Sequence, residues 1–245
     1  LRSSEADCSH FAAVSQTAVS PFSQQVQPQV KVLHNGIETD RCRVETSRPE
    51  FRRRWNIPET ATVIGYVGRY SYEKFPLAAA LAVRHIDRPD VVALFCGEGW
   101  RKADVVSDVK SLIGDRAIFL PYQENVGDVL NGIDVCMAAS PAEGFSLAIT
   151  EAWYCEVPCV STRVGSVPEL EKRFGQLAAS VPVHASPSEL VAGTQEALSS
   201  RFLEDCVPRA KAMVCEHFTA EKMAERWEDY LISIVRPAET TTSNT

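Results

Sequence analysis

Short apolar segments alternate with helix-favouring segments along most of this 245-residue chain. The segments 62–67, 91–96, 117–120, 133–139 and 157–161 are apolar and are bounded by turn-forming or polar residues. Each has the length of a buried strand, and a segment of helical character follows each one. Strands separated by helices form βαβ units with right-handed crossovers and a parallel sheet. We therefore expect an α/β fold in which helices flank a parallel sheet.

The remaining elements can be placed by the same periodicity. We expect helices at 48–55, 77–86, 101–113, 126–130, 147–154, 166–172, 188–199, 204–215 and 219–234, and further short strands at 11–15, 30–33 and 175–180. Ligands of parallel sheets bind beyond the carboxyl ends of the strands. The loops that start at Gly68, Gly97, Pro121 and Ser140 lie at that edge, so a binding site is expected there.

Residues 140–151 join one of these strands to a helix and carry two carboxylates. The backbone N–H groups of residues 145–147 would lie in the first helical turn, where they lack intrahelical partners and suit a phosphate. Glu143 precedes this anion site, and Glu151 lies roughly 7–8 Å further along the helix axis. The two carboxylates can therefore hold different hydroxyl-bearing parts of one ligand. The alternative is that Glu143 is a solvated loop residue and Glu151 an ordinary charge on a helix surface.

A second candidate site is the loop 68–74, which follows the strand at 62–67. Arg69 can donate two hydrogen bonds to phosphate oxygens, and Lys74 can act as a point charge. The alternative is a pair of surface cations next to Glu73. The loop lacks the glycine spacing of a nucleotide-binding P-loop or a dinucleotide fingerprint, so its phosphate role depends on the neighbouring site.

Composition excludes several classes of protein. The net charge of -7 argues against a nucleic-acid-binding protein, which would carry a basic excess. The basic cluster formed by Arg48 and residues 52–54 is interrupted by acidic residues and is expected to be a solvated helix face. No apolar stretch is long enough to span a bilayer.

The eight cysteines are scattered, and several lie in apolar segments where Cys behaves as a small hydrophobic residue. No Cys/His spacing typical of zinc and no Asp-x-Asp pair occurs, so neither a metal ion nor another cofactor is expected. Reduced thiols are typical of a cytoplasmic chain.

Five pieces of the sequence, in this order and spacing, resemble a known family. They are residues 34–38 (His-Asn-Gly-Ile-Glu), 65–69 (Gly-Tyr-Val-Gly-Arg) with Glu73 and Lys74, 97–99 (Gly-Glu-Gly), 143–151 with its Glu-x7-Glu spacing, and 165–170 (Gly-Ser-Val-Pro-Glu-Leu). Together they resemble the C-terminal, nucleotide-sugar-binding half of GT-B glycosyltransferases, in the family-4 group called glycosyl transferases group 1. The resemblance implies a Rossmann-like domain. Ser166 departs from it, because a second glycine is common there.

The resemblance also implies roles for single residues. Glu143 would contact the donor sugar near the reacting carbon, and Glu151 would bind the ribose hydroxyls. Arg69 and Lys74 would neutralise the leaving diphosphate, and with Glu143 they form the expected catalytic set. The expected donor-binding set comprises Gly68, Gly97, Tyr122, Gly144, Phe145, Ser146, Leu147 and Glu151, of which residues 145–147 would bind the diphosphate through backbone N–H groups and Tyr122 would lie near the base.

The resemblance divides the chain into three parts. Residues 1–36 would be a remnant of an N-terminal acceptor domain with its linker, residues 37–235 the nucleotide-sugar-binding domain, and residues 236–245 a disordered tail. The rest of the acceptor domain would be missing or supplied by a separate chain. A cytoplasmic location is expected, and peripheral contact of the whole protein with a membrane is left open.

The expected function is that of a retaining glycosyltransferase, which moves a sugar from a nucleotide-diphosphate sugar to a polysaccharide, a lipid or a small molecule. No metal ion is expected to take part. Two alternatives stay open. The chain could be a nucleotide-sugar epimerase of the same fold, or a non-catalytic partner subunit that binds nucleotide sugar.

Overall fold

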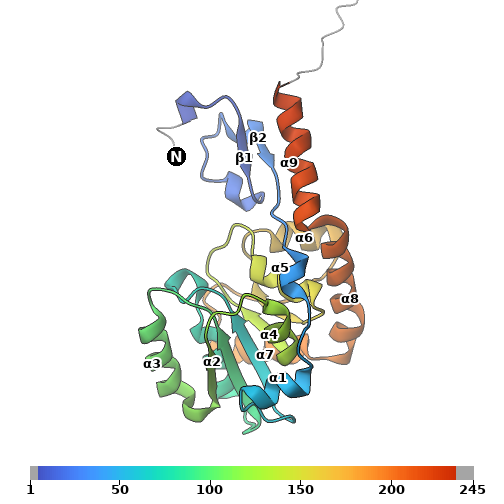
Figure 1. Ribbon diagram of the computed structural model, residues 1–245. Helices are drawn as coiled ribbons and strands as arrows, with labels where there is room; N and C mark the ends of the chain where they lie inside the picture. The colour runs from blue at the N-terminus through green and yellow to red at the C-terminus, as the bar shows by residue number, and fades with distance from the viewer. Residues whose placement is uncertain (1–4, 236–245) are drawn as a thin grey trace, which may run out of the picture.

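A six-stranded parallel sheet forms the centre of the computed structural model, which describes residues 5–235 (Figure 1). Its strands are β3 (Thr62–Val67), β4 (Val91–Cys96), β5 (Ala117–Leu120), β6 (Val135–Ala138), β7 (Cys159–Thr162) and β8 (Ala179–Val181). The strand order is β5-β4-β3-β6-β7-β8, so the direction of winding reverses between β3 and β6. Such a reversal opens a crevice at the carboxyl ends of the two strands.

Helices cover both faces of the sheet, which confirms the predicted fold class. They are α1 (Arg48–Arg54), α2 (Leu77–His85), α3 (Lys102–Ile113), α4 (Val126–Gly132), α5 (Leu147–Tyr154), α6 (Val167–Phe174), α7 (Pro187–Ala197), α8 (Ser200–His217) and α9 (Ala220–Val235). One core lies between the sheet and α2, α3, α7 and the first half of α8, and a second lies under α1, α4, α5, α6 and the second half of α8. All six residues of β4 are buried, as expected for a parallel strand covered on both faces. None of the helices within residues 5–235 combines the length and apolarity needed to cross a bilayer.

A small N-terminal unit lies apart from the large sheet. Its two parallel strands, β1 (Phe11–Ala13) and β2 (Val30–Val32), pair only with each other among the described residues. Helix α9 extends beyond the large sheet to this unit (Figure 1), where the Tyr230 hydroxyl donates a hydrogen bond to the carbonyl oxygen of Phe11 at 3.2 Å. The domain boundary at residue 36 stays a prediction, and residues 236–245, expected to be a disordered tail, lie outside the described residues.

The linker between the unit and the sheet is tied to the start of α9. Ile37 donates its N–H to Phe218 at 2.9 Å and accepts a hydrogen bond from the N–H of Ala220 at 2.8 Å. At Gly36, a Cβ atom would lie 2.1 Å from the carbonyl oxygen of Thr219, so only glycine permits this close approach. The linker therefore docks where α8 gives way to α9.

The basic cluster on α1 is not the solvated face that its composition suggests. Arg52 is only 3% exposed, and its guanidinium donates to Asp134 at 2.9 Å. Arg48 also pairs with Asp134, which in addition accepts the backbone N–H of Val63 at 2.7 Å. The prediction was wrong for these two arginines because their partner comes from the segment before β6, far away in sequence. Arg53 and Arg54 are exposed as predicted.

Candidate functional site

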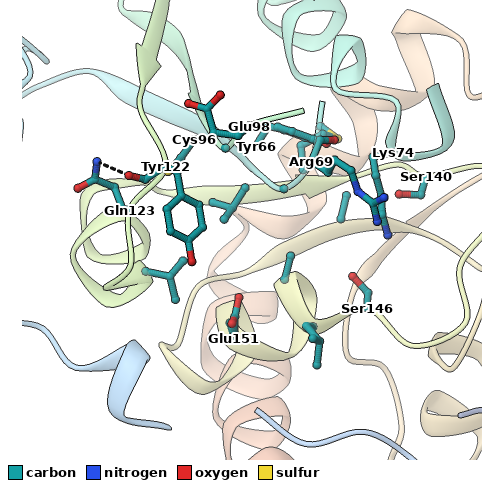
Figure 2. Close-up of a pocket in the computed structure, with 18 of the residues that line it drawn as sticks. Tyr66, Arg69, Lys74, Cys96, Glu98, Tyr122, Gln123, Ser140, Ser146 and Glu151 are labelled. Atoms are coloured by element: carbon teal, nitrogen blue, oxygen red, sulfur yellow. Dashed lines mark hydrogen bonds between the residues drawn. The ribbon is translucent and has the colours of Figure 1, made fainter. Parts of the chain in front are cut away.

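A cavity of about 490 Å³ opens at the carboxyl ends of β3 and β6, where the direction of winding reverses (Figure 2). This volume is typical of pockets for small molecules. The predicted site residues that line it are Gly68, Arg69, Lys74, Gly97, Tyr122, Glu143, Phe145, Ser146, Leu147 and Glu151. Gly144 does not line the cavity. Its Cα faces Val14 of the N-terminal unit, and its carbonyl oxygen lies beside Gly165.

Two glycines bring the loops after β3 and β4 into direct contact. A Cβ atom on Gly97 would lie 1.9 Å from the carbonyl oxygen of Gly68, and the φ angle of Gly97 is +154°. The N–H of Gly68 donates to the carbonyl of Cys96 at 3.0 Å. Close backbone approach of this kind needs glycine. The close approach at Gly97 is to the backbone of Gly68, and the prediction that these two glycines bind the donor stays a prediction.

Lys74 reaches across the cavity to Glu143. Its Nζ atom lies 2.6 Å from both carboxylate oxygens, and the Glu143 side chain is only 10% exposed. Lys74 ends the short turn Tyr72–Lys74, which is followed by Phe75 in the left-handed region at φ 43°. The sequence left open a pairing of Lys74 with Glu73; the partner is instead Glu143, from the loop after β6.

Arg69 belongs to the same loop and lines the same cavity. Its guanidinium has no hydrogen bond or ion pair within residues 5–235, whereas its backbone carbonyl accepts the Tyr66 hydroxyl at 2.6 Å. Figure 2 shows the Arg69 and Lys74 side chains running side by side toward the part of the pocket where Ser140 and Ser146 lie. One unpaired cation and one paired cation thus lie next to each other.

Helix α5 begins at Leu147, as predicted for the helix at 147–154, so of residues 145–147, which were expected in the first turn, only Leu147 lies within the helix. Ser146 is the N-cap of α5 and accepts the N–H of Ile149 at 3.4 Å. The N–H groups of Leu147 and Ala148 make no hydrogen bond within the described chain, as is usual in a first turn, and both residues line the cavity. The ring of Phe145 is buried, 5.9 Å from that of His34 and 5.8 Å from that of Phe218. Two backbone N–H groups that bind no other part of the described chain therefore lie at the same cavity as Lys74.

Glu151 lies one turn further along α5 and is only 8% exposed. Burial raises the pKa of its carboxyl group, and the nearby charge of Glu38 raises it further, while Arg41 lowers it. Arg41 Nη1 lies 3.8 Å from Glu151 Oε1. The carboxylate is thus buried, beside one cation and facing the cavity.

Several further residues line the cavity that sequence reasoning did not single out. They include Arg41, Tyr66, Cys96, Glu98 and Gln123. Glu98 is marked in the sequence only as the middle residue of Gly-Glu-Gly, and Arg41 lies in the short helical turn Thr39–Cys42, which has no apolar periodicity and no glycine. Their closeness in sequence to the other motifs was the only signal that could have indicated these residues.

The acidic and thiol groups do not gather as metal ligands: within residues 5–235 no three His, Cys, Asp or Glu side chains are placed to hold a metal ion together. The expectation that neither a metal ion nor a cofactor takes part stays a prediction.

Comparison with known proteins gives a consistent result. The family model described as Glycosyl transferases group 1 matches residues 47–213. N-acetyl-alpha-D-glucosaminyl L-malate synthase of Bacillus anthracis is 25% identical over 228 residues, which cover 91% of this chain and 59% of that protein. D-inositol 3-phosphate glycosyltransferase of Streptomyces scabiei is 29% identical over 153 residues, covering 57% of this chain and 34% of that protein.

Solved structures match over nearly all of the chain. Anabaena Alr3699/HepE in complex with UDP-glucose superposes with a TM-score of 0.81 at 19% identity, covering 92% of this chain and 64% of that one. WaaG, a glycosyltransferase of lipopolysaccharide biosynthesis, superposes with a TM-score of 0.73 at 16% identity, covering 93% and 62%. These structures share the fold. The chain spans less than two thirds of the length of these relatives.

Proposed function

This chain belongs to the glycosyl transferases group 1 family, and from that premise we propose that it is the donor-binding half of a retaining glycosyltransferase. The donor would be a nucleotide-diphosphate sugar. The observation that carries the proposal is the meeting of the Lys74–Glu143 pair, the unpaired Arg69 and the free N–H groups of α5 in one cavity. The acceptor would be held by a further domain or chain.

The proposed roles follow from charge and position. The diphosphate would lie between Arg69, Lys74 and the N-terminus of α5, where positive charge and free N–H groups favour an anion. The bond between the anomeric carbon and the diphosphate would break with its electron pair on the leaving oxygen, whose charge these groups would stabilise. An acceptor hydroxyl would form the new bond to the same face of that carbon and pass its proton to the leaving phosphate oxygen. Glu143 would lie beside the sugar, and Glu151 would accept hydrogen bonds from the ribose.

UDP is the first nucleotide to test. Support comes from Anabaena Alr3699/HepE, which has been solved with UDP and with UDP-glucose bound and shares the fold. The base would lie near Tyr122, Gln123 and Glu98, which line the end of the cavity away from Lys74 (Figure 2).

Calorimetric titration of the chain with UDP, GDP and ADP tests donor binding. We expect one of the three to bind and Arg69→Ala to weaken it roughly 10- to 100-fold, since a charged hydrogen bond contributes about 1.5–3 kcal/mol. Lys74→Ala should also weaken binding. Arg53→Ala removes an exposed arginine on α1 and should leave the affinity unchanged. If a folded sample binds none of the three nucleotides, the proposal is wrong.

Product analysis separates the proposal from its alternatives. A transferase supplied with its acceptor half releases a nucleoside diphosphate and a glycosylated acceptor. An epimerase of the same fold returns a changed sugar without any acceptor, and a non-catalytic partner subunit binds the nucleotide without either product.

A further inference from the structure

Arg41 joins two walls of the cavity at the end opposite Lys74. Its Nε donates to the carbonyl oxygen of Glu124 at 3.1 Å, its Nη2 donates to the Tyr122 hydroxyl at 3.4 Å, and its Nη1 lies 3.8 Å from Glu151 Oε1. Figure 2 shows Tyr122 and Glu151 close together on one side of the pocket, away from Arg69 and Lys74. One side chain thus connects the loop after β5 to the buried carboxylate on α5.

The segment that carries Arg41 is held firmly in place. It forms the short helical turn Thr39–Cys42, which packs on α4 so closely that a Cβ atom on Gly127 would lie 2.3 Å from the carbonyl oxygen of Arg43. Just beyond the turn, Asp128 Oδ1 accepts the N–H groups of Glu45 at 2.7 Å and Thr46 at 2.8 Å. The backbone of Arg41 is therefore fixed relative to the cavity.

The groups around Glu151 show why Arg41 affects its carboxyl. The charged and titratable groups that act on its carboxyl are Arg41 and Glu38, and the thiols of Cys42 and Cys155 lie beside it. Arg41 is the only cation in that set. Burial favours the neutral acid, whereas the guanidinium favours the carboxylate.

We propose that Arg41 is a positioning residue for ribose selection: held by Tyr122 and the carbonyl of Glu124, its guanidinium lies beside the buried Glu151 carboxyl and orients that carboxyl toward the ribose hydroxyls of the nucleotide. The inference rests on the proposed function, because it assumes that a nucleoside diphosphate occupies the cavity. An ionised carboxylate accepts hydrogen bonds from two hydroxyls, whereas a protonated one has less acceptor capacity. Removal of Arg41 should therefore reduce selection for ribose rather than affinity for the diphosphate.

The test compares the dissociation constants of UDP and 2′,3′-dideoxy-UDP between pH 5.5 and 8.5. The wild-type chain should prefer UDP by roughly 10- to 100-fold, the value of charged hydrogen bonds to the ribose. In Arg41→Ala the preference should fall several-fold at the acidic end of this range and recover as the pH rises, because loss of the cation raises the pKa of Glu151. The two nucleotides share the same phosphates, so phosphate titration cancels in the ratio.

Three variants serve as controls. Arg43→Ala removes the neighbouring arginine, which pairs with Asp40 at the surface at 2.7 Å, and should keep the wild-type ratio at every pH. Arg41→Lys keeps the charge and should keep the pH course close to that of the wild type. Glu151→Gln should show little preference at any pH. Thermal unfolding of each variant shows that it is folded.

Three results would overturn the inference. If Arg41→Ala weakens UDP and dideoxy-UDP equally and independently of pH, Arg41 has only a structural or phosphate-binding role. If its ratio and pH course match those of the wild type, Arg41 has no role in ribose selection, although the donor site stands. If the wild-type chain binds no UDP, the inference fails together with the choice of nucleotide on which it rests.

Discussion

At the scale of single residues, two carboxylates form ion pairs with cations that lie far away in the sequence. Asp134 accepts hydrogen bonds from Arg48, Arg52 and the N–H of Val63, and Glu143 pairs with Lys74. The sequence shows where the charged residues are, but unlike the apolar residues of a helix or strand, they follow no regular spacing that would indicate which charges form pairs. This is why the basic cluster of Arg48 and residues 52–54 was predicted to be solvated and why Glu73 was left open as a partner of Lys74.

The Asp134 cluster should contribute strongly to stability. In Asp134→Ala the guanidinium of Arg52, which is 3% exposed, loses its counter-charge, and the N–H of Val63 loses its acceptor. Breaking a buried pair in this way costs about 3–5 kcal/mol, and because the Asp134 side chain is 27% exposed, the loss should lie at the lower end of that range. We expect a loss of that size in urea unfolding at an unchanged m-value.

A matched control is Asp90→Ala. Asp90 pairs with Arg88 at 2.5 Å, but both side chains are largely exposed, and such pairs contribute only about 0–1 kcal/mol. Equal losses for the two variants would show that burial of the Asp134 cluster does not matter.

At the scale of secondary structure, the first three strands of the sheet were predictable to the residue and the last three were less so. The bounds predicted for β3, β4 and β5 match the structure, whereas β6, predicted at 133–139, spans Val135–Ala138, and β7, predicted at 157–161, spans Cys159–Thr162. Apolar residues continue beyond the paired residues of β6 and β7, so an apolar segment alone does not mark where pairing ends. The last strand was predicted at 175–180 but spans Ala179–Val181. The N–H groups of Leu177 and Ala178 donate to the Glu171 carboxylate at 3.2 and 3.3 Å, so these apolar residues are buried without being in a strand.

The contact between the loops after β3 and β4 can be tested at Gly97. In Gly97→Ala the new methyl group would collide with the carbonyl of Gly68, so the loops must separate. We expect a loss of roughly 2–4 kcal/mol in unfolding free energy. Nucleotide affinity should fall as well, because both loops line the cavity.

Gly114→Ala is the control that distinguishes the backbone strain of a positive φ from the collision of the new methyl group with a neighbouring loop. Gly114 also has a positive φ, +54°, but nothing lies within 4 Å of its Cβ position. This variant should cost about 1–2 kcal/mol of backbone strain and leave nucleotide binding unchanged. If Gly97→Ala behaves in the same way, the close approach of the two loops does not shape the site.

At the scale of the whole molecule, the fold class followed from the alternation of strands and helices, and the position of the cavity followed from the edge at which the loops meet. The docking of the N-terminal unit could not be predicted in the same way. His34 and Gln16 both contact the Glu169 carboxylate, at 2.5 and 2.7 Å, and Tyr230 on α9 reaches Phe11. These contacts join segments at opposite ends of the sequence and leave no local pattern.

The bridge between Ile37 and the start of α9 has a consequence for the rate at which amide protons exchange with solvent. The N–H groups of Ile37 and Ala220 are protected only while both segments stay docked, so both should exchange slowly. Any change that undocks the segments should speed up the exchange of both together. Gly36→Ala, which would force a methyl group against Thr219, should accelerate both amides. Amides of β3 and β4 should keep their wild-type protection in deuterium-exchange mass spectrometry. If they lose protection equally, the two ends of the chain and the central sheet open as a single cooperative unit.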